Sequence, residues 1–219
     1  MRIDHHPSED ILLAYAAGDL PESWSLLVAT HIALCPVCRA DVSTAEAIGG
    51  SLLADETPAV LSSDALAATL MRVQADDTAV EAESAAHDHA TPPILPQPLR
   101  GYCGGDLDDL KWKALGRNAQ HIPLVRGADG ATARLLKIPA GQPVPTHGHN
   151  GLELTLVLQG SFVDGESRFG RGDVETADDA VEHQPVAEPG LDCICLAVTD
   201  APLRFRSPFA RLVQPLIGI

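Results

Sequence analysis

The chain has 219 residues, of which 45% are hydrophobic and 4% aromatic, and its formal net charge is -15. That apolar fraction is typical of a folded chain, and the length suits one large domain or two small ones. Direct docking on nucleic acid or on an anionic membrane requires clustered Lys and Arg, so a chain this acidic is predicted to do neither.

The negative charge is concentrated in the first 90 residues, which carry 15 acidic side chains and three basic ones. The remaining residues balance 15 acidic side chains against 12 basic ones. This contrast predicts two domains with different partners. The N-terminus is polar, and no apolar run approaches the roughly 18 residues of a membrane span, which predicts a cytoplasmic protein. In a reducing compartment the five cysteines are expected to be ligands, reactive thiols or buried small residues rather than disulfides.

Residues 1–75 are predicted to be helical from their apolar periodicity and from their capping residues. The predicted helices are one capped by Ser8 and ended by Gly18, one from Pro21 to about Leu34, one from Pro36 to the pair Gly49 and Gly50, and one capped by Ser62 or Ser63 with an apolar stripe through Leu66, Ala67, Leu70, Met71 and Val73.

Residues 76–99 are predicted to be an interdomain linker. This stretch is acidic, and its proline-rich run at 91–98 has too little apolar periodicity to form a core element. From residue 100 onward, short runs rich in β-branched residues are separated by Gly, Pro and Asp, which predicts strands. The runs lie at 131–139, 152–163, 181–187 and 191–199. Short strands at regular spacing predict a small antiparallel sandwich or barrel.

The first candidate metal site is the pattern His31-x3-Cys35-x2-Cys38. Residues four apart share a helix face, so His31 and Cys35 are expected to point the same way, while Pro36 forces a turn before Cys38. Structural zinc takes four ligands, which leaves one to be supplied from nearby. His5 and His6 are the candidates, and His6 is favoured because it lies nearer the helix. The alternative is two buried cysteines and a surface histidine.

This pattern resembles the zinc-binding anti-sigma domain, in which a distant N-terminal His precedes His-x3-Cys-x2-Cys between two helices. The resemblance covers roughly residues 1–75. It implies a helical bundle that clamps a sigma factor of the extracytoplasmic-function class, with a zinc ion that fixes the helices and with thiolates that can respond to oxidants. The acidic charge agrees, because sigma-factor regions that touch DNA are commonly basic.

The second candidate metal site combines His147, His149, Glu153 and His183. The first two are two apart in an extended segment and so face the same side, and Glu153 follows after a turn into a strand. Imidazoles and a carboxylate are costly to bury inside a small barrel unless a metal binds them. His183 can supply a third imidazole from a later strand. This ligand set would accept Zn, Mn, Fe or Ni; the alternative is ordinary surface or core histidines.

From Gly141 to Gly160 the spacing is similar to the first cupin motif, Gly-x5-His-x-His-x3-Glu-x6-Gly. The second cupin motif is matched more loosely, because Gly170 to Asp173 stands in place of its Pro-x-Gly turn and His183 arrives late. The resemblance implies that His183 is a ligand by role, and it favours zinc as the metal.

Cys193 and Cys195 lie two apart on an apolar strand, so their side chains share one face. A disulfide between them is disfavoured, since their Cα atoms would be about 6.6 Å apart. They are interpreted either as small buried hydrophobic residues or as a candidate redox pair near the metal. Cys103, His87 and His89 are interpreted as incidental.

A zinc anti-sigma domain, a linker and a cupin in one chain resemble the ChrR family of transcriptional regulators. The implied fold is an all-α N-terminal zinc-binding helical bundle (1–75), a linker (76–99) and an all-β C-terminal cupin, a small antiparallel barrel (100–219). The resemblance implies two zinc ions per chain and a one-to-one complex with an extracytoplasmic-function sigma factor. It also implies release of that factor on oxidative stress, such as singlet oxygen or organic peroxide.

The alternative function is a metal-dependent cupin enzyme, a dioxygenase or an isomerase, with an N-terminal zinc docking module. No cluster of Arg, Lys or Tyr accompanies the predicted ligands to position an anionic substrate. These sequence features therefore favour a regulator that is not an enzyme.

Overall fold

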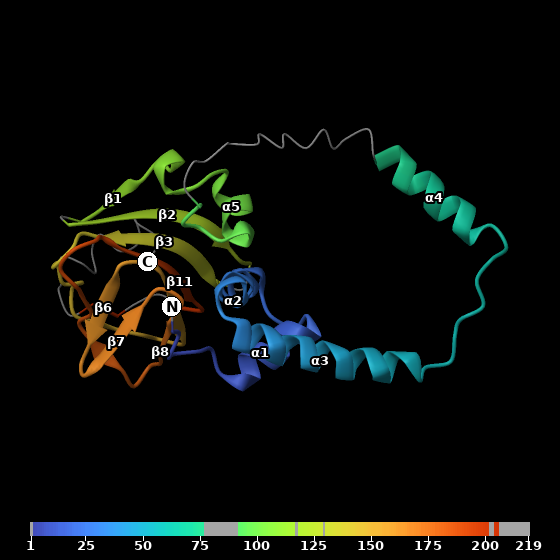
Figure 1. Cartoon of the computed structure of the whole chain (residues 1–219), viewed down its shortest axis with the longest axis horizontal. Helices are drawn as coiled ribbons and strands as arrows, with labels where there is room; N and C mark the ends of the chain where they lie inside the picture. The colour runs from blue at the N-terminus through green and yellow to red at the C-terminus, as the bar shows by residue number, and fades with distance from the viewer. Residues whose placement is uncertain (1, 77–91, 117, 129, 202–203, 206–219) are drawn as a thin grey trace. The chain divides into compact units, whose positions relative to one another are not determined.

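The computed structural model describes residues 2–76, 92–116, 118–128, 130–201 and 204–205. Within these ranges the N-terminal part is helical and the C-terminal part consists of antiparallel strands, which confirms the predicted fold class (Figure 1). The helices are α1 (Glu9–Ala17), α2 (Glu22–Leu34), α3 (Pro36–Ala54), α4 (Ala65–Asp76), α5 (Gln97–Cys103) and a short 3-10 helix (Leu107–Asp109). The strands are β1 (Lys113–Leu115), β2 (Ala119–Arg126), β3 (Thr132–Ile138), β4 (His147–Gly148), β5 (Glu153–Gln159), β6 (Ser161–Asp164), β7 (Ser167–Gly170), β8 (Val174–Ala177), β9 (Glu182–His183), β10 (Val186–Ala187), β11 (Cys193–Thr199) and β12 (Arg204–Phe205).

A sharp bend separates α2 from α3, whose axes differ by 119°. Cys35 lies at the bend with extended backbone angles, because the residue before a proline is disfavoured in the helical region, and Pro36 then begins α3. In the described part of the chain no single helix is long and apolar enough to cross a membrane, and α2 and α3 pass that test only as a bent pair.

The predicted end of α3 at Gly49 and Gly50 is wrong, because the helix continues to Ala54. A glycine ends a helix when it adopts the left-handed conformation, as Gly18 does after α1 with φ 77°. Neither glycine of α3 has a positive φ, and the helix-forming residues on both sides carry the helix through the pair.

The strands form one six-stranded sheet, in the order β1-β2-β3-β11-β5-β8, and two three-stranded sheets, β10-β6-β7 and β12-β4-β9. The run predicted at 152–163 divides into β5 and β6 at Gly160, where φ is 67° and a Cβ atom would lie 2.7 Å from the Asp192 carbonyl oxygen. Strands β1, β2, β4, β7, β8 and β12 lie outside the predicted strand runs. All strand pairs between named strands are antiparallel, as the small-barrel prediction requires.

Helices α2 and α5 pack on one face of the six-stranded sheet and share its largest apolar core. The core combines Trp24, Leu26 and Leu27 of α2 with Leu95 and Leu99 near α5, and with the side chains that β3, β5 and β11 direct to that face, Ala133, Leu135, Leu154, Leu156, Leu158, Ile194, Leu196 and Val198. The other face of β5 carries Glu153, Thr155 and Val157, which is why every residue from Glu153 to Leu158 is buried.

The prediction that the proline-rich run 91–98 forms no core element is wrong. Leu95 and Leu99 are 1% and 0% exposed. Pro96 is the N-cap of α5 and Pro98 lies in its first turn, so here the prolines begin a helix instead of preventing one. The Asp106 carboxylate fixes the approach to α5 by accepting hydrogen bonds from the backbone N–H groups of Ile94 and Leu95, both at 2.8 Å. Residues 77–91 of the predicted linker, with His87 and His89, lie outside the described residues.

The chain divides into two compact units, one made of Met1–Ala47 with Pro93–Ile219 and the other of Ile48–Pro92. The first unit therefore joins the first helices to the β-rich part, a link that the sequence analysis did not foresee. The predicted domain boundaries at 75 and 99 stay a prediction.

Candidate metal centres

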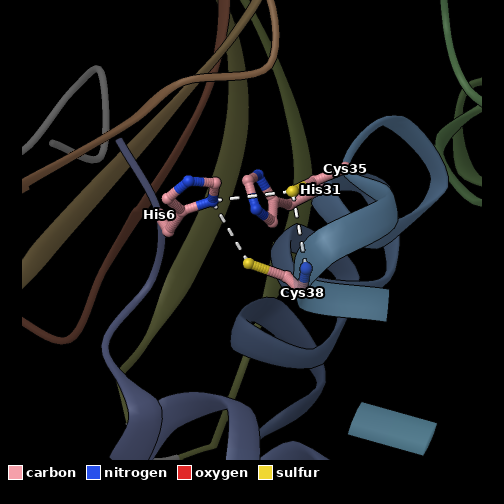
Figure 2. Close-up of side chains that lie close together, drawn as sticks. All are labelled: His6, His31, Cys35 and Cys38. Atoms are coloured by element: carbon pink, nitrogen blue, oxygen red, sulfur yellow. Dashed lines mark hydrogen bonds between the residues drawn. The ribbon is translucent and has the colours of Figure 1, made fainter. Parts of the chain in front are cut away.

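The bend between α2 and α3 brings together His31, Cys35 and Cys38, and the N-terminal segment adds His6 (Figure 2). One ligand atom from each of the four side chains lies within 4.8 Å of all the others. The Nδ1 atom of His6 is 3.5 Å from the Cys35 Sγ atom and 3.3 Å from the Cys38 Sγ atom. Two imidazoles and two thiols are a ligand set typical of structural zinc sites.

His31 is fully buried and is oriented for metal binding. Its Nδ1–H donates to the Gly172 carbonyl oxygen at 2.9 Å, while its Nε2 atom is buried without a hydrogen-bond partner. Burial, reinforced by nearby His6, lowers the pKa of His31 to about 4, so the ring is neutral and Nε2 keeps its lone pair at pH 7. A buried, unpaired imidazole nitrogen beside two thiols fits a bound metal.

The cysteines at this centre are buried, with Cys35 1% and Cys38 2% exposed. Burial, followed by the neighbouring Cys35, raises the pKa of Cys38 to about 12. A zinc ion binds thiolates, so its binding would have to displace the proton from this thiol. The four side chains thus fit a metal ion, whose positive charge would stabilise the Cys38 thiolate.

The structure separates the two candidate N-terminal histidines. His6 points to the cysteines, whereas the His5 ring packs against Phe169, with a centroid distance of 4.4 Å, and its Nδ1 atom lies 3.7 Å from the Asp173 carboxylate. Neighbouring residues of an extended segment point to opposite sides, so only one of the two can face the cysteines.

Replacing His6 by Ala is expected to lower the zinc affinity of this centre by at least about 100-fold, because even groups that only support a metal ligand contribute 10–100-fold. Replacing His5 by Ala is expected to leave the zinc affinity unchanged. Competition with a chromophoric zinc chelator measures both values. Equal losses in the two variants would contradict the placement of His6.

The second centre lies where β4 and β9 pair, with His147 directly opposite His183. His149 is the residue directly after β4. The Nε2 atom of His183 is 3.1 Å from that of His149 and 3.2 Å from that of His147. All three side chains are buried. Their short separations show that three imidazole nitrogens converge on one point inside the barrel.

In two of the three histidines the second ring nitrogen lies within hydrogen-bonding distance of an oxygen atom. His147 Nδ1 is 2.9 Å from the Pro145 carbonyl oxygen, and His183 Nδ1 is 2.7 Å from a carboxylate oxygen of Asp164. Burial, followed by the other two histidines, lowers the pKa of His149 to about 4. The hydrogen bonds at Nδ1 of His147 and His183 direct the Nε2 atoms of these rings to the centre, which is the usual orientation of metal-bound histidine.

Glu153 lies beside this centre, but its carboxylate is not among the converging ligand atoms. One of its oxygens is 3.7 Å from His149 Nδ1, and the other accepts a hydrogen bond from the Thr155 hydroxyl at 3.1 Å. Burial raises the pKa of Glu153, and the Thr155 hydroxyl, His183 and Arg134 oppose this shift. Its role as a fourth ligand stays a prediction.

Two further acids at this centre were missed by the sequence analysis. Asp164 and Glu175 form a candidate ligand group with His183, whose Nδ1 atom faces both carboxyl groups. Burial, followed by the charge and hydrogen bond of Asp164, raises the pKa of Glu175 to about 8. Alternation along β8 places Glu175 and Val174 on opposite faces of the sheet, but it does not determine which face is internal. The pairing of Glu175 with Thr155 on β5 decides it.

Cys193 and Cys195 share a face as predicted, with their Sγ atoms 3.5 Å apart. They pack in an apolar cluster with Val157 and Phe162. The hydrogen bond to Cys193 and then burial raise the pKa of Cys195, and the nearby acids Glu175 and Glu153 add to the shift. Buried, protonated thiols react slowly with oxidants, so this environment favours the interpretation as core residues. Their role as a redox pair stays a prediction.

Comparisons with known proteins identify the relatives of this chain. Residues 103–202 match the ChrR cupin-like domain family. The chain is 50% identical to the anti-sigma-E factor ChrR of Cereibacter sphaeroides over 219 residues, which is the full length of both proteins. It also matches a chain in the crystal structure of Rhodobacter sphaeroides SigE in complex with the anti-sigma ChrR, at 48% identity and a TM-score of 0.76. That match covers 90% of this chain and 99% of the other.

Identity at this level over the entire length confirms the resemblance that the two motifs indicated. The relative is a regulatory protein, which decides against the alternative of a cupin enzyme. The chain belongs to the ChrR family of anti-sigma factors.

Proposed function

We propose that this protein binds an extracytoplasmic-function sigma factor in a one-to-one complex and keeps it from RNA polymerase. The observation that carries the proposal is an apolar surface on α4 and on the end of α3. Leu66, Leu70, Met71 and Val73 of α4 are 51–72% exposed, and Ile48, Leu52 and Leu53 of α3 are 60–74% exposed. The crystal structure of the relative bound to SigE supports the choice of partner.

An apolar stripe on an exposed helix is unfavourable in water. None of the described side chains of α4 is buried, although Leu66, Leu70 and Val73 recur at helical spacing on one face. Exposed apolar surface of this extent marks a binding site, and an amphipathic helix typically fills an apolar groove of its partner. The acidic charge of the first 90 residues complements the basic surfaces of a DNA-binding partner, and such a partner places the protein in the cytoplasm.

The proposal includes one zinc ion in each centre. His6, His31, Cys35 and Cys38 would hold the N-terminal ion, which would tie the N-terminal segment to α2 and α3. His147, His149 and His183 would hold the second ion, with Glu153 as the fourth ligand. In this arrangement residues 1–75 bind the sigma factor, residues 76–99 link the domains and residues 100–219 form the sensor.

The sensor is proposed to respond to oxidative stress, by the family resemblance singlet oxygen or organic peroxide. Release requires that the oxidised protein bind the sigma factor less tightly than the resting protein, and couplings of this kind are typically 5- to 150-fold. The two buried metal centres are the groups whose chemistry an oxidant can change.

Co-expression with the sigma factor encoded nearest to this protein, followed by purification and metal analysis, tests the proposal. The expected product contains one sigma factor and two zinc ions per chain, and it dissociates on exposure to photosensitised singlet oxygen or to an organic peroxide. Failure of any extracytoplasmic-function sigma factor of the host to co-purify would overturn the binding function. A complex that survives both oxidants would overturn the release alone.

A further inference from the structure

The N-terminal segment before α1 is fastened to the β-rich part of the chain at the turn between β7 and β8. One carboxylate oxygen of Asp173 accepts hydrogen bonds from the backbone N–H groups of Asp4 at 2.7 Å and His5 at 3.0 Å. The other oxygen accepts one from the Gly170 N–H at 2.8 Å. The Val174 N–H donates to the His5 carbonyl oxygen at 3.1 Å. Both oxygens of this buried carboxylate are thus used by backbone donors.

These bonds adjoin the N-terminal metal centre. His5 directly precedes His6, and the carbonyl oxygen of Gly172 accepts the hydrogen bond from His31. Gly172 and Asp173 of the turn, together with Val174 at the start of β8, therefore fix the positions of both histidines that face Cys35 and Cys38. The two cysteines lie at the bend between α2 and α3.

A comparable arrangement elsewhere in the chain shows what is particular about Asp173. Asp106 also accepts hydrogen bonds from two successive backbone N–H groups, those of Ile94 and Leu95. The segment held by Asp106 inserts a leucine into the core, whereas the segment held by Asp173 carries a candidate metal ligand. An unfastened N-terminus is normally poorly ordered, so bringing His6 to the metal would then require ordering that segment at the moment of binding.

We propose that the turn Gly170–Asp173 positions the two histidines of the N-terminal metal centre, so that the cupin helps to retain the metal of the anti-sigma domain. This inference rests on the proposed occupancy of that centre by a metal ion. The Gly172 carbonyl holds His31 with its Nε2 atom toward the cysteines, and Asp173 holds the backbone from which His6 projects.

The same turn leads into the second centre. Strand β8 begins directly after Asp173 and carries Glu175, whose carboxyl group adjoins Asp164 and His183. Only two residues separate Gly172 from Glu175. A movement of β8 at the second centre would therefore shift the groups that hold His6 and His31. In this way damage at the sensor would weaken the binding of the N-terminal metal.

The test uses the full-length protein loaded with Co²⁺ and challenged with a chelator. Thiolate-to-cobalt absorption reports the centre that contains Cys35 and Cys38, and a Cys35→Ser variant verifies the assignment of the band. In Asp173→Asn one carboxylate oxygen is replaced by an amide NH2 group, which cannot accept a hydrogen bond from a backbone N–H group. Loss of this absorption is expected to be about tenfold faster than in the wild type, the lower end of the effect of groups that support metal ligands.

Asp106→Asn is the matched control and is expected to lose cobalt at the wild-type rate. Equal acceleration in both Asn variants would mean general destabilisation and would overturn the positioning role, as would a wild-type rate in Asp173→Asn. Failure of the wild type to develop the thiolate band would instead contradict the proposed metal occupancy.

Should Asp173→Asn fail to fold, amide hydrogen exchange of the wild type provides the test. Removing the metal is expected to speed exchange at His5 and at Val174 and to leave Leu95 unchanged. Unaltered exchange at His5 and Val174 would overturn the inference.

Discussion

Replacing Leu66 and Leu70 together by Asp is expected to weaken sigma-factor binding by at least about 100-fold. Central apolar anchors of an interface each contribute about 2 kcal/mol or more, and each 1.4 kcal/mol is a factor of ten in affinity. Both side chains are largely exposed in the free protein, at 72% and 51%, so the replacement removes no core contact. Titration of a labelled sigma factor measures the dissociation constant.

The control for this double variant is Leu191→Asp, which places the same charge on a leucine that is 64% exposed in the turn before β11. It is expected to bind the sigma factor as the wild type does. The thermal unfolding midpoints of all three proteins should agree, since exposed substitutions typically change stability by less than about 0.5 kcal/mol. Undiminished binding by the Leu66, Leu70 double variant would exclude α4 from the interface.

Replacing Cys35 or Cys38 by Ser is expected to reduce the metal content from two ions per chain to one and to abolish sigma-factor binding. Structural zinc contributes about 10–16 kcal/mol to the folding of small zinc domains, which equals or exceeds the whole stability of a typical domain. The apolar cluster around these cysteines is small, with Leu12, Val28 and Val42 as its other buried members. Metal analysis and a pull-down of the sigma factor measure the two effects.

Cys103→Ser provides the matched control, because Cys103 lies at the end of α5 and belongs to neither metal centre. This variant is expected to retain both metal ions and full sigma-factor binding. A double variant of Cys35 and Cys38 that captured the sigma factor with wild-type affinity would show that the metal is unnecessary for inhibition.

The sequence predicted those parts of the N-terminal metal centre that depend only on residues close together in the chain. The spacing of His31, Cys35 and Cys38 and the proline between the cysteines determine one bend and one shared face, whatever surrounds them. The choice between His5 and His6 depends on residues far apart in the sequence. Alternation places them on opposite sides of an extended segment, and the docking of that segment on β8 decides which side faces the cysteines.

The cupin centre shows the same division. The motif from Gly141 to Gly160 revealed His147 and His149, because a regular spacing of ligands survives in the sequence, whereas His183 was assigned by role. Asp164 and Glu175 left no comparable pattern. An acid in a short alternating strand is expected to be exposed, and only the pairing of β8 with β5 turns Glu175 toward His183.

By itself the sequence determined the two motifs, the helical and β-rich halves and the family. Each of these depends on spacing along a few turns of helix or a single strand. Tertiary structure alone decided that α2 shares its core with the sheet, that Leu95 and Leu99 enter that core, and that His31 bonds to a carbonyl 141 residues away. The physical reason is that periodicity shows which side chains are buried, whereas long-range packing selects what they are buried against.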